Sequence, residues 1–171
     1  MSLVIFTCAV GYITSNSTIE TTNAIIGIVL VAIGAGAAGC LNMWYDSDID
    51  ALMTRTCLRP IPTGKITRNY ALIYGVTLTV VSVILLNYFT NFLSAALLLF
   101  TILFYILVYT IWLKRKTPQN IVIGGAAGAL PPIIGWSIAT NSISLEPISC
   151  LLYTSDAADE GLGVDLGGRR I

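Results

Sequence analysis

The chain has 171 residues, of which 56% are apolar and 11% are charged, and its mean hydropathy is +0.82. This composition excludes an ordinary soluble domain and places the chain among integral membrane proteins. The chain contains no histidine, which excludes a His-ligated metal site and a His general base within these residues.

Uncharged apolar runs of spanning length predict an all-α, polytopic membrane helical bundle. The first run, residues 3–15, is too short for a full span, and we expect it to be the tail of a helix that begins upstream. Four longer runs follow at residues 24–41, 71–89, 92–113 and 121–138, and a second incomplete helix is expected from Glu146. Residues 1–149 are therefore expected to form one transmembrane unit with about four complete and two partial spans.

Glycines gather on two of these predicted spans. They are Gly34, Gly36 and Gly39 in the run 24–41, and Gly124, Gly125 and Gly128 in the run 121–138. Because small residues let helix backbones approach closely in a membrane, both faces are expected to pack against neighbouring helices.

The formal net charge of zero hides a segregation of charge along the chain. Up to residue 149, every basic residue lies in one of two connections, which follow the runs 24–41 and 92–113. These residues are Arg55, Arg59, Lys65, Arg68, Lys114, Arg115 and Lys116. Every second connection between membrane spans lies on the same side of the membrane. The positive-inside bias therefore predicts that the two basic connections, one of which is the loop 42–69, face the cytoplasm.

Asn42, Asp46 and Asp50 are spaced by four residues where the span 24–41 meets this loop. Steps of four advance about 400° around a helix, so the three side chains are expected on one face while Asp48 points away. A carboxylate costs about 2.5–3.5 kcal/mol at the centre of a bilayer, which favours a functional reason for acids at the end of a span. Two carboxylates and an amide oxygen suit Mg2+ shared with a diphosphate.

Cations that suit a diphosphate follow this acidic stripe. Arg55 and Arg59 would share a face if the helix continued through them, and the prolines at 60 and 62 should then break it. Lys65 follows in a Thr-Gly-Lys turn, and Lys114 and Arg115 enter from the other cytoplasmic connection. Arginine binds phosphate with two parallel hydrogen bonds and lysine binds it as a point charge. The pattern predicts ionisation of an allylic diphosphate whose hydrocarbon stays in apolar surroundings.

Each of these features also has a plainer interpretation. Acids at the end of a span can be solvated caps, and basic residues beside spans, Lys114 and Arg115 among them, can be topology determinants alone. A channel or transporter would use the acids as an ion site, although such acids lie at mid-membrane depth on broken helices. A non-catalytic scaffold gives no reason for the stripe.

Two motifs resemble the intramembrane UbiA-type prenyltransferases. They are N-M-W-Y-D-S-D-I-D at 42–50, like the family's first Asp-rich motif, and R-T-C-L-R-P-I-P-T-G at 55–64, like the segment that follows it. Two further stretches are most similar to the branch of the superfamily that farnesylates heme. These are M-S-L-V-I-F-T at 1–7 and L-K-R-K-T-P-Q-N-I-V-I-G-G-A-A-G-A-L-P-P-I-I-G-W at 113–136. The resemblance covers residues 1–149.

The resemblance implies a fragment of a nine-helix fold that transfers a farnesyl group from farnesyl diphosphate to heme b. It implies that Asn42, Asp46 and Asp50 are catalytic and hold Mg2+ with the diphosphate. The five basic residues Arg55, Arg59, Lys65, Lys114 and Arg115 would bind the diphosphate. It also implies a bacterial inner membrane protein whose partners are the two substrates, the lipid bilayer and a downstream heme-modifying enzyme, with no nucleic acid. An aromatic acceptor of quinone biosynthesis stays open, since R-P-I-P-T-G suits that group as well.

The chain departs from the family pattern in its C-terminal part. The family's second Asp-rich motif is absent, so we expect a truncated chain that is inactive alone. Residues 150–171, C-L-L-Y-T-S-D-A-A-D-E-G-L-G-V-D-L-G-G-R-R-I, turn abruptly polar and resemble the conceptual translation of a transposon-based sequencing adapter. We expect them not to be native, the alternative being a polar tail.

Overall fold

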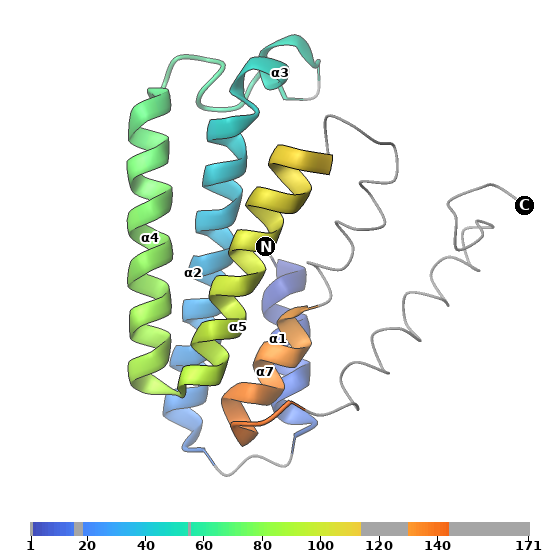
Figure 1. Ribbon diagram of the computed structural model, residues 1–171, viewed down its shortest axis with the longest axis vertical. Coiled ribbons are helices and arrows are strands. Elements are labelled where there is room, and N and C mark those ends of the chain that lie inside the picture. Colours follow the sequence, from blue (N-terminus) through green and yellow to red (C-terminus); the bar gives the residue numbers. More distant parts are fainter. Residues whose placement is uncertain (1, 16–18, 55, 114–129, 144–171) are drawn as a thin grey trace, which may run out of the picture.

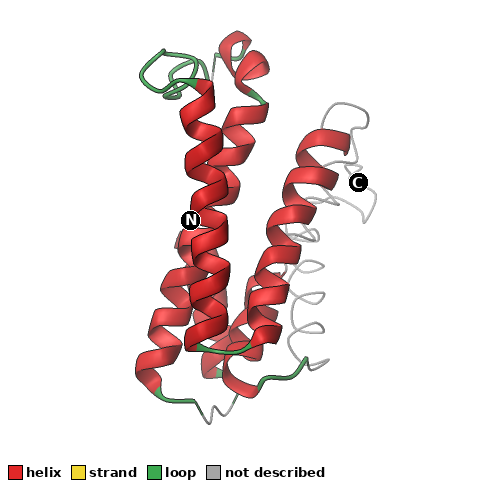
Figure 2. Ribbon diagram, turned by 60° about the vertical axis from the view of Figure 1, so that its left-hand side comes forward, coloured by secondary structure: helices red, strands yellow, loops and turns green. Residues whose placement is uncertain are grey.

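The computed structural model describes residues 2–15, 19–54, 56–113 and 130–143. The elements in chain order are α1 (Ser2–Ile13), α2 (Thr21–Tyr45), α3 (Ser47–Leu52), α4 (Arg68–Phe89), α5 (Phe92–Leu103), the π-helix η1 (Phe104–Leu113) and α7 (Leu130–Thr140). These ranges contain helices and loops but no strand (Figure 2). The all-α bundle that the sequence predicts is confirmed (Figure 1).

Three continuous helices in the described residues are long and apolar enough to cross a membrane. They run over Thr21–Tyr45, Arg68–Phe89 and Phe92–Trp112, and they match the predicted spans 24–41, 71–89 and 92–113. The run 3–15 forms the shorter apolar helix α1. Residues 121–129 and the segment from Glu146 lie outside the described residues, so the fourth complete span and the second partial one stay predictions.

The helices α2 and α4 lie side by side, and α5 leans across them (Figure 1). The shorter helices α1 and α7 pack chiefly against each other. We call the end of the bundle that carries α3 the loop end, and the end that carries the tight connection between α4 and α5 the turn end. The buried core consists mainly of aliphatic side chains from α2, α4, α5 and α7, among them Leu30, Val31, Leu86, Leu98, Ile102, Ile134 and Ile138.

Glycines set the closest approaches between helices. A Cβ built on Gly135 of α7 would overlap the backbone of Cys8 in α1, and one built on Gly11 of α1 would overlap the backbone of α7. Gly34 of α2 faces a leucine and an isoleucine of α5, in agreement with its predicted packing role. The glycine face predicted at 124–128 lies outside the described residues.

One side of α4 presents large apolar side chains that the described helices leave uncovered. Ile73, Val80 and Ile84 are 62%, 49% and 61% exposed. Apolar surface of this kind is unfavourable in water but not against lipid hydrocarbon. The outer face of α4 therefore suits a lipid environment.

Candidate functional site

Asn42, Asp46 and Asp50 lie on one buried face at the loop end. Asp46 occupies the turn between α2 and α3, yet the helical pairing continues through it. The Asp46 N–H donates to the Asn42 carbonyl at 2.9 Å, and the Asp50 N–H donates to the Asp46 carbonyl at 2.8 Å. Asn42, Asp46 and Asp50 are only 8%, 0% and 2% exposed, whereas Asp48 is exposed. The structure thus places the three side chains together and Asp48 away from them, as the spacing predicts.

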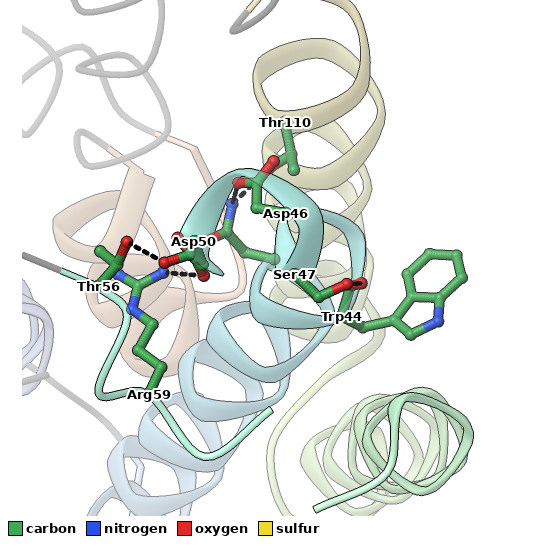
Figure 3. A network of polar contacts seen from close by, with 8 residues as sticks. Trp44, Asp46, Ser47, Asp50, Thr56, Arg59 and Thr110 are labelled. Atoms are coloured by element: carbon green, nitrogen blue, oxygen red, sulfur yellow. Dashed lines mark hydrogen bonds and ion pairs between the residues drawn. The ribbon is translucent and has the colours of Figure 1, made fainter. Parts of the chain in front are cut away.

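The amide of Asn42 connects this stripe to η1. Its Nδ2 donates to Asp46 Oδ2 at 3.0 Å and to Thr110 Oγ1 at 3.1 Å (Figure 3). Thr110 is fully buried, and its hydroxyl donates in turn to the Tyr105 carbonyl at 2.9 Å. The site is therefore built from two segments that are far apart in the sequence.

Asp50 pairs with the one predicted phosphate-binding arginine that the structure describes. Arg59 Nη1 donates to Asp50 Oδ2 at 2.7 Å, and the side chains of Arg59 and Asp50 are 36% and 3% exposed (Figure 3). A buried carboxylate requires such compensation, because an uncompensated charge costs several kcal/mol in a protein interior. Arg59 thus brings a partly accessible guanidinium beside the acidic stripe.

The loop reaches Asp50 through turns and not through a continued helix. The helix α3 ends at Leu52, and Met53 takes an extended conformation with φ −91° and ψ 125°. The Thr56 hydroxyl donates to the Asp50 carbonyl at 3.1 Å, which replaces the backbone N–H that a continued helix would supply. The helix therefore does not continue to Arg59, which nevertheless lies beside the stripe.

The remaining predicted cations are not brought to the stripe within the described residues. Lys65 is exposed in the predicted turn, where Gly64 has φ 74°, and it makes no hydrogen bond or ion pair with the stripe. Arg55, Lys114 and Arg115 lie outside the described residues, so their roles stay predictions.

Sequence reasoning missed Thr110 and Thr56. Thr110 is a lone hydroxyl near the end of a predicted span that returns to the loop end, and that position is the only signal in the sequence. Thr56 lies between Arg55 and Arg59 in the sequence, and nothing in this pattern indicates that its hydroxyl contacts the Asp50 carbonyl. Both were found only because the fold brings them to the stripe.

The donor chemistry of the stripe fits Mg2+ shared with a substrate. No group of three or more His, Cys, Asp or Glu side chains converges within the described ranges, so these residues form no closed metal cage. Mg2+ is commonly held by one or two carboxylates together with waters and substrate phosphates. Asp46, Asp50 and the amide oxygen of Asn42 provide a partial oxygen set of that kind.

The chain matches the model of the UbiA prenyltransferase family over residues 3–155. It belongs to this family. A curated relative from Pelagibacter ubique, named protoheme IX farnesyltransferase, is 73% identical over 152 residues, which cover 89% of this chain and 50% of the relative. Protoheme IX farnesyltransferase 2 of Mesorhizobium japonicum is 59% identical over 152 residues, which cover 89% of this chain and 48% of the relative. A protoheme IX farnesyltransferase of Rhodopseudomonas palustris is 54% identical over 148 residues, which cover 86% of this chain and 47% of the relative. No solved structure matches the chain significantly.

The family match confirms the resemblance that the motifs at 42–50 and 55–64 indicate. Family membership and three apolar helices of spanning length together make this UbiA-family chain an integral membrane protein. The chain spans about half the length of the curated relatives that it matches.

Proposed function

We propose that the protein containing this chain transfers a farnesyl group from farnesyl diphosphate to heme b, which yields heme O. The observation that carries the proposal is the buried stripe of Asn42, Asp46 and Asp50 with Arg59 paired to its end. The names of the relatives at 54–73% identity support heme as the acceptor. The activity is proposed for the whole protein, since the relatives are about twice as long as the matched region.

Negative charge grows on the diphosphate as the allylic C–O bond breaks, and the site would stabilise this charge through the cations that it holds. Bound Mg2+ would supply positive charge to the leaving group. Asp46, Asp50 and the amide oxygen of Asn42 would hold the ion. Arg59 would donate N–H groups to a phosphate oxygen, with the remaining predicted cations as further donors. Preorganised donors of this kind lower a barrier because they need not reorient during the reaction.

The position of the stripe also suits the apolar part of the substrate. Asn42 lies near the end of α2, an apolar helix long enough to cross a membrane. A diphosphate held at the stripe would leave its isoprenoid chain beside apolar helix surface and lipid. An allylic cation formed there would be protected from water, which would otherwise capture it.

The placement in the cell follows from the distribution of charge. We propose a bacterial inner membrane protein whose loop end faces the cytoplasm, because the basic connections follow the positive-inside bias. Farnesyl diphosphate would then enter from the cytoplasmic side, and the product would pass to a downstream heme-modifying enzyme.

Product analysis tests the proposal. The protein for this test is a chimera. In it, residues 3–149 of this chain replace the matching half of the Pelagibacter ubique relative, to which the chain is 73% identical over the matched region. We expect this chimera, supplied with farnesyl diphosphate, heme b and Mg2+, to convert one vinyl group of the heme to a hydroxyethylfarnesyl group and to release diphosphate. The mass of the heme then increases by one farnesyl group from the diphosphate and one hydroxyl group from water. A prenylated benzoate or naphthoate, formed when aromatic acceptors are supplied instead, would identify the quinone branch. The absence of any Mg2+-dependent prenylation would contradict both assignments.

A further inference from the structure

Thr110 of η1 is the contact that joins the stripe to a second membrane-spanning segment. We propose that Thr110 is a positioning residue that fixes the orientation of the Asn42 amide, so that the amide oxygen and not the NH2 group is presented to the cation. The proposal rests on the proposed role of the stripe in holding Mg2+ with a diphosphate. It adds a residue outside the Asp-rich motif, 68 positions further along the chain.

The direction of the Thr110 hydroxyl is set by its own helix. Its single hydrogen is donated to the Tyr105 carbonyl at 2.9 Å. A hydroxyl that has committed its hydrogen can act toward other neighbours only as an acceptor. Thr110 Oγ1 therefore requires a donor from Asn42, 3.1 Å away, and would repel its carbonyl oxygen.

Asp46 imposes the same orientation from the other side. Its carboxylate oxygen Oδ2 accepts from Asn42 Nδ2 at 3.0 Å. The two amide hydrogens of Asn42 are thus both used, one by Asp46 and one by Thr110. Within the described residues, no group donates to Asn42 Oδ1, so this oxygen keeps its acceptor capacity for a ligand.

The π-helical register makes the Thr110 contact possible. In an α-helix a threonine hydroxyl donates to the carbonyl three or four residues back, as Thr101 of α5 does to Leu97 at 2.7 Å. Thr110 instead reaches the carbonyl five residues back, because η1 is wound as a π-helix. Segments of π-helix are rare and frequently occur at functional sites. The Thr110 contact therefore depends on the wider turn of η1, and the variants below examine this contact.

Removal of the Thr110 hydroxyl should allow the Asn42 amide to flip, so that its oxygen and its NH2 group exchange places. In Thr110→Val the isosteric side chain neither accepts nor donates, so only Asp46 would orient Asn42. A turned amide would present its NH2 group to a cation, which is unfavourable. The affinity for a divalent cation should fall while the packing volume at position 110 stays nearly constant.

The experiment measures cation binding and not turnover. Mn2+, used in place of Mg2+, is titrated into the purified chimera with a non-reactive farnesyl thiodiphosphate, and the free ion is followed by electron paramagnetic resonance. We expect Thr110→Val to weaken Mn2+ binding about two- to tenfold, which corresponds to the loss of one hydrogen bond. Thr110→Ser should bind like the parent. Thr101→Val is the matched control, because Thr101 lies in the same continuous helix, Phe92–Trp112, and its hydroxyl donates to the Leu97 carbonyl of that helix.

A double-mutant cycle separates positioning from a general structural role. In an Asn42→Ala background, Thr110→Val should have no further effect on Mn2+ affinity, since the amide that it orients is gone. Thr110→Ala serves in the same cycle if the valine variant does not fold. Three results would each overturn the proposal. They are unchanged Mn2+ binding in the Thr110 variants, equal losses of affinity in Thr110→Val and Thr110→Ser, and a full additional loss in the Asn42→Ala background. None of them would contradict the proposed farnesyl transfer. If the parent chimera binds no Mn2+ with the analogue, the metal role of the stripe fails, and this proposal fails with it.

Discussion

The bundle carries a polar network at each end, and the two networks differ in charge. At the turn end, Asn91 Oδ1 accepts from the backbone N–H and the hydroxyl of Ser94, both at 2.8 Å. Asn91 Nδ2 donates to the Ser137 carbonyl at 2.8 Å, and the hydroxyls of Ser94 and Ser137 lie 2.9 Å apart. This network caps α5 and ties it to α7 with neutral groups alone.

At the loop end, the network contains buried ionisable groups. Asp46 and Asp50 are almost completely buried, and Arg59 compensates Asp50 at 2.7 Å. Neutral hydrogen bonds suffice to join helices, as the turn end demonstrates, and burying charge adds a desolvation cost of several kcal/mol per ion. Packing alone therefore does not require the buried charge at the loop end, and the following substitutions test the role proposed for it.

The largest effect is expected from Asp46→Asn. The substitution keeps the shape of the side chain but removes a buried carboxylate from the proposed cation site. Mg2+-dependent prenylation by the chimera should fall by about 100-fold or more. Asp48→Asn is the matched control, because Asp48 is the neighbouring exposed acid, and it should retain activity. Equal activity in both variants would remove the metal role of Asp46.

A smaller effect is expected from Arg59→Gln. This change removes the cation beside Asp50 and a proposed donor to the diphosphate. Because charge-assisted hydrogen bonds contribute about 1.5–3 kcal/mol, KM for farnesyl diphosphate should rise at least about tenfold. Arg68→Gln provides the comparison, since Arg68 donates to the Trp44 carbonyl at 3.2 Å and packs over its ring, 5.5 Å from the centroid. A similar rise in KM for both variants would indicate a non-specific effect of loop charge.

The smallest effect is expected at the turn end, from Ser137→Ala. This variant loses the contact with Ser94 and a hydrogen bond to the Ile134 carbonyl at 2.9 Å. The chimera should lose about 0.5–1.5 kcal/mol of stability, measured by thermal unfolding in detergent, because the variant loses the buried hydrogen bond that the Ser137 hydroxyl donates. The kcat and KM of the folded protein should not change. A selective loss of cation binding would break the contrast between the two ends.

The sequence predicted the features that depend on local periodicity. Apolar runs located the helices α2, α4 and α5, because the length and composition of a membrane span are properties of a single segment. The spacing of Asn42, Asp46 and Asp50 predicted a shared face for the same reason. The backbone pairing through Asp46 preserves this spacing even where α2 gives way to α3.

The features that the sequence did not predict depend on contacts between distant segments or on competition for one group. Thr110 reaches Asn42 only through the packing of η1 near α2 and through a π-helical register. The end of α3 depends on the Thr56 hydroxyl, which competes with the backbone for the Asp50 carbonyl. The pairing of Gly11 with α7 requires knowledge of which helices become neighbours.

The close packing of α1 against α7 has a consequence for the synthesis of the protein. Gly11 and Gly135 are separated by 124 residues, so α1 leaves the ribosome long before its partner exists. At about 5–20 residues per second, this interval lasts roughly 6–25 s. During that time, the glycine face of α1 is open to lipid, to the insertion machinery or to a chaperone. The contact between α1 and α7 therefore forms only after the helices α2, α4 and α5, which lie between them in the sequence, have been synthesised.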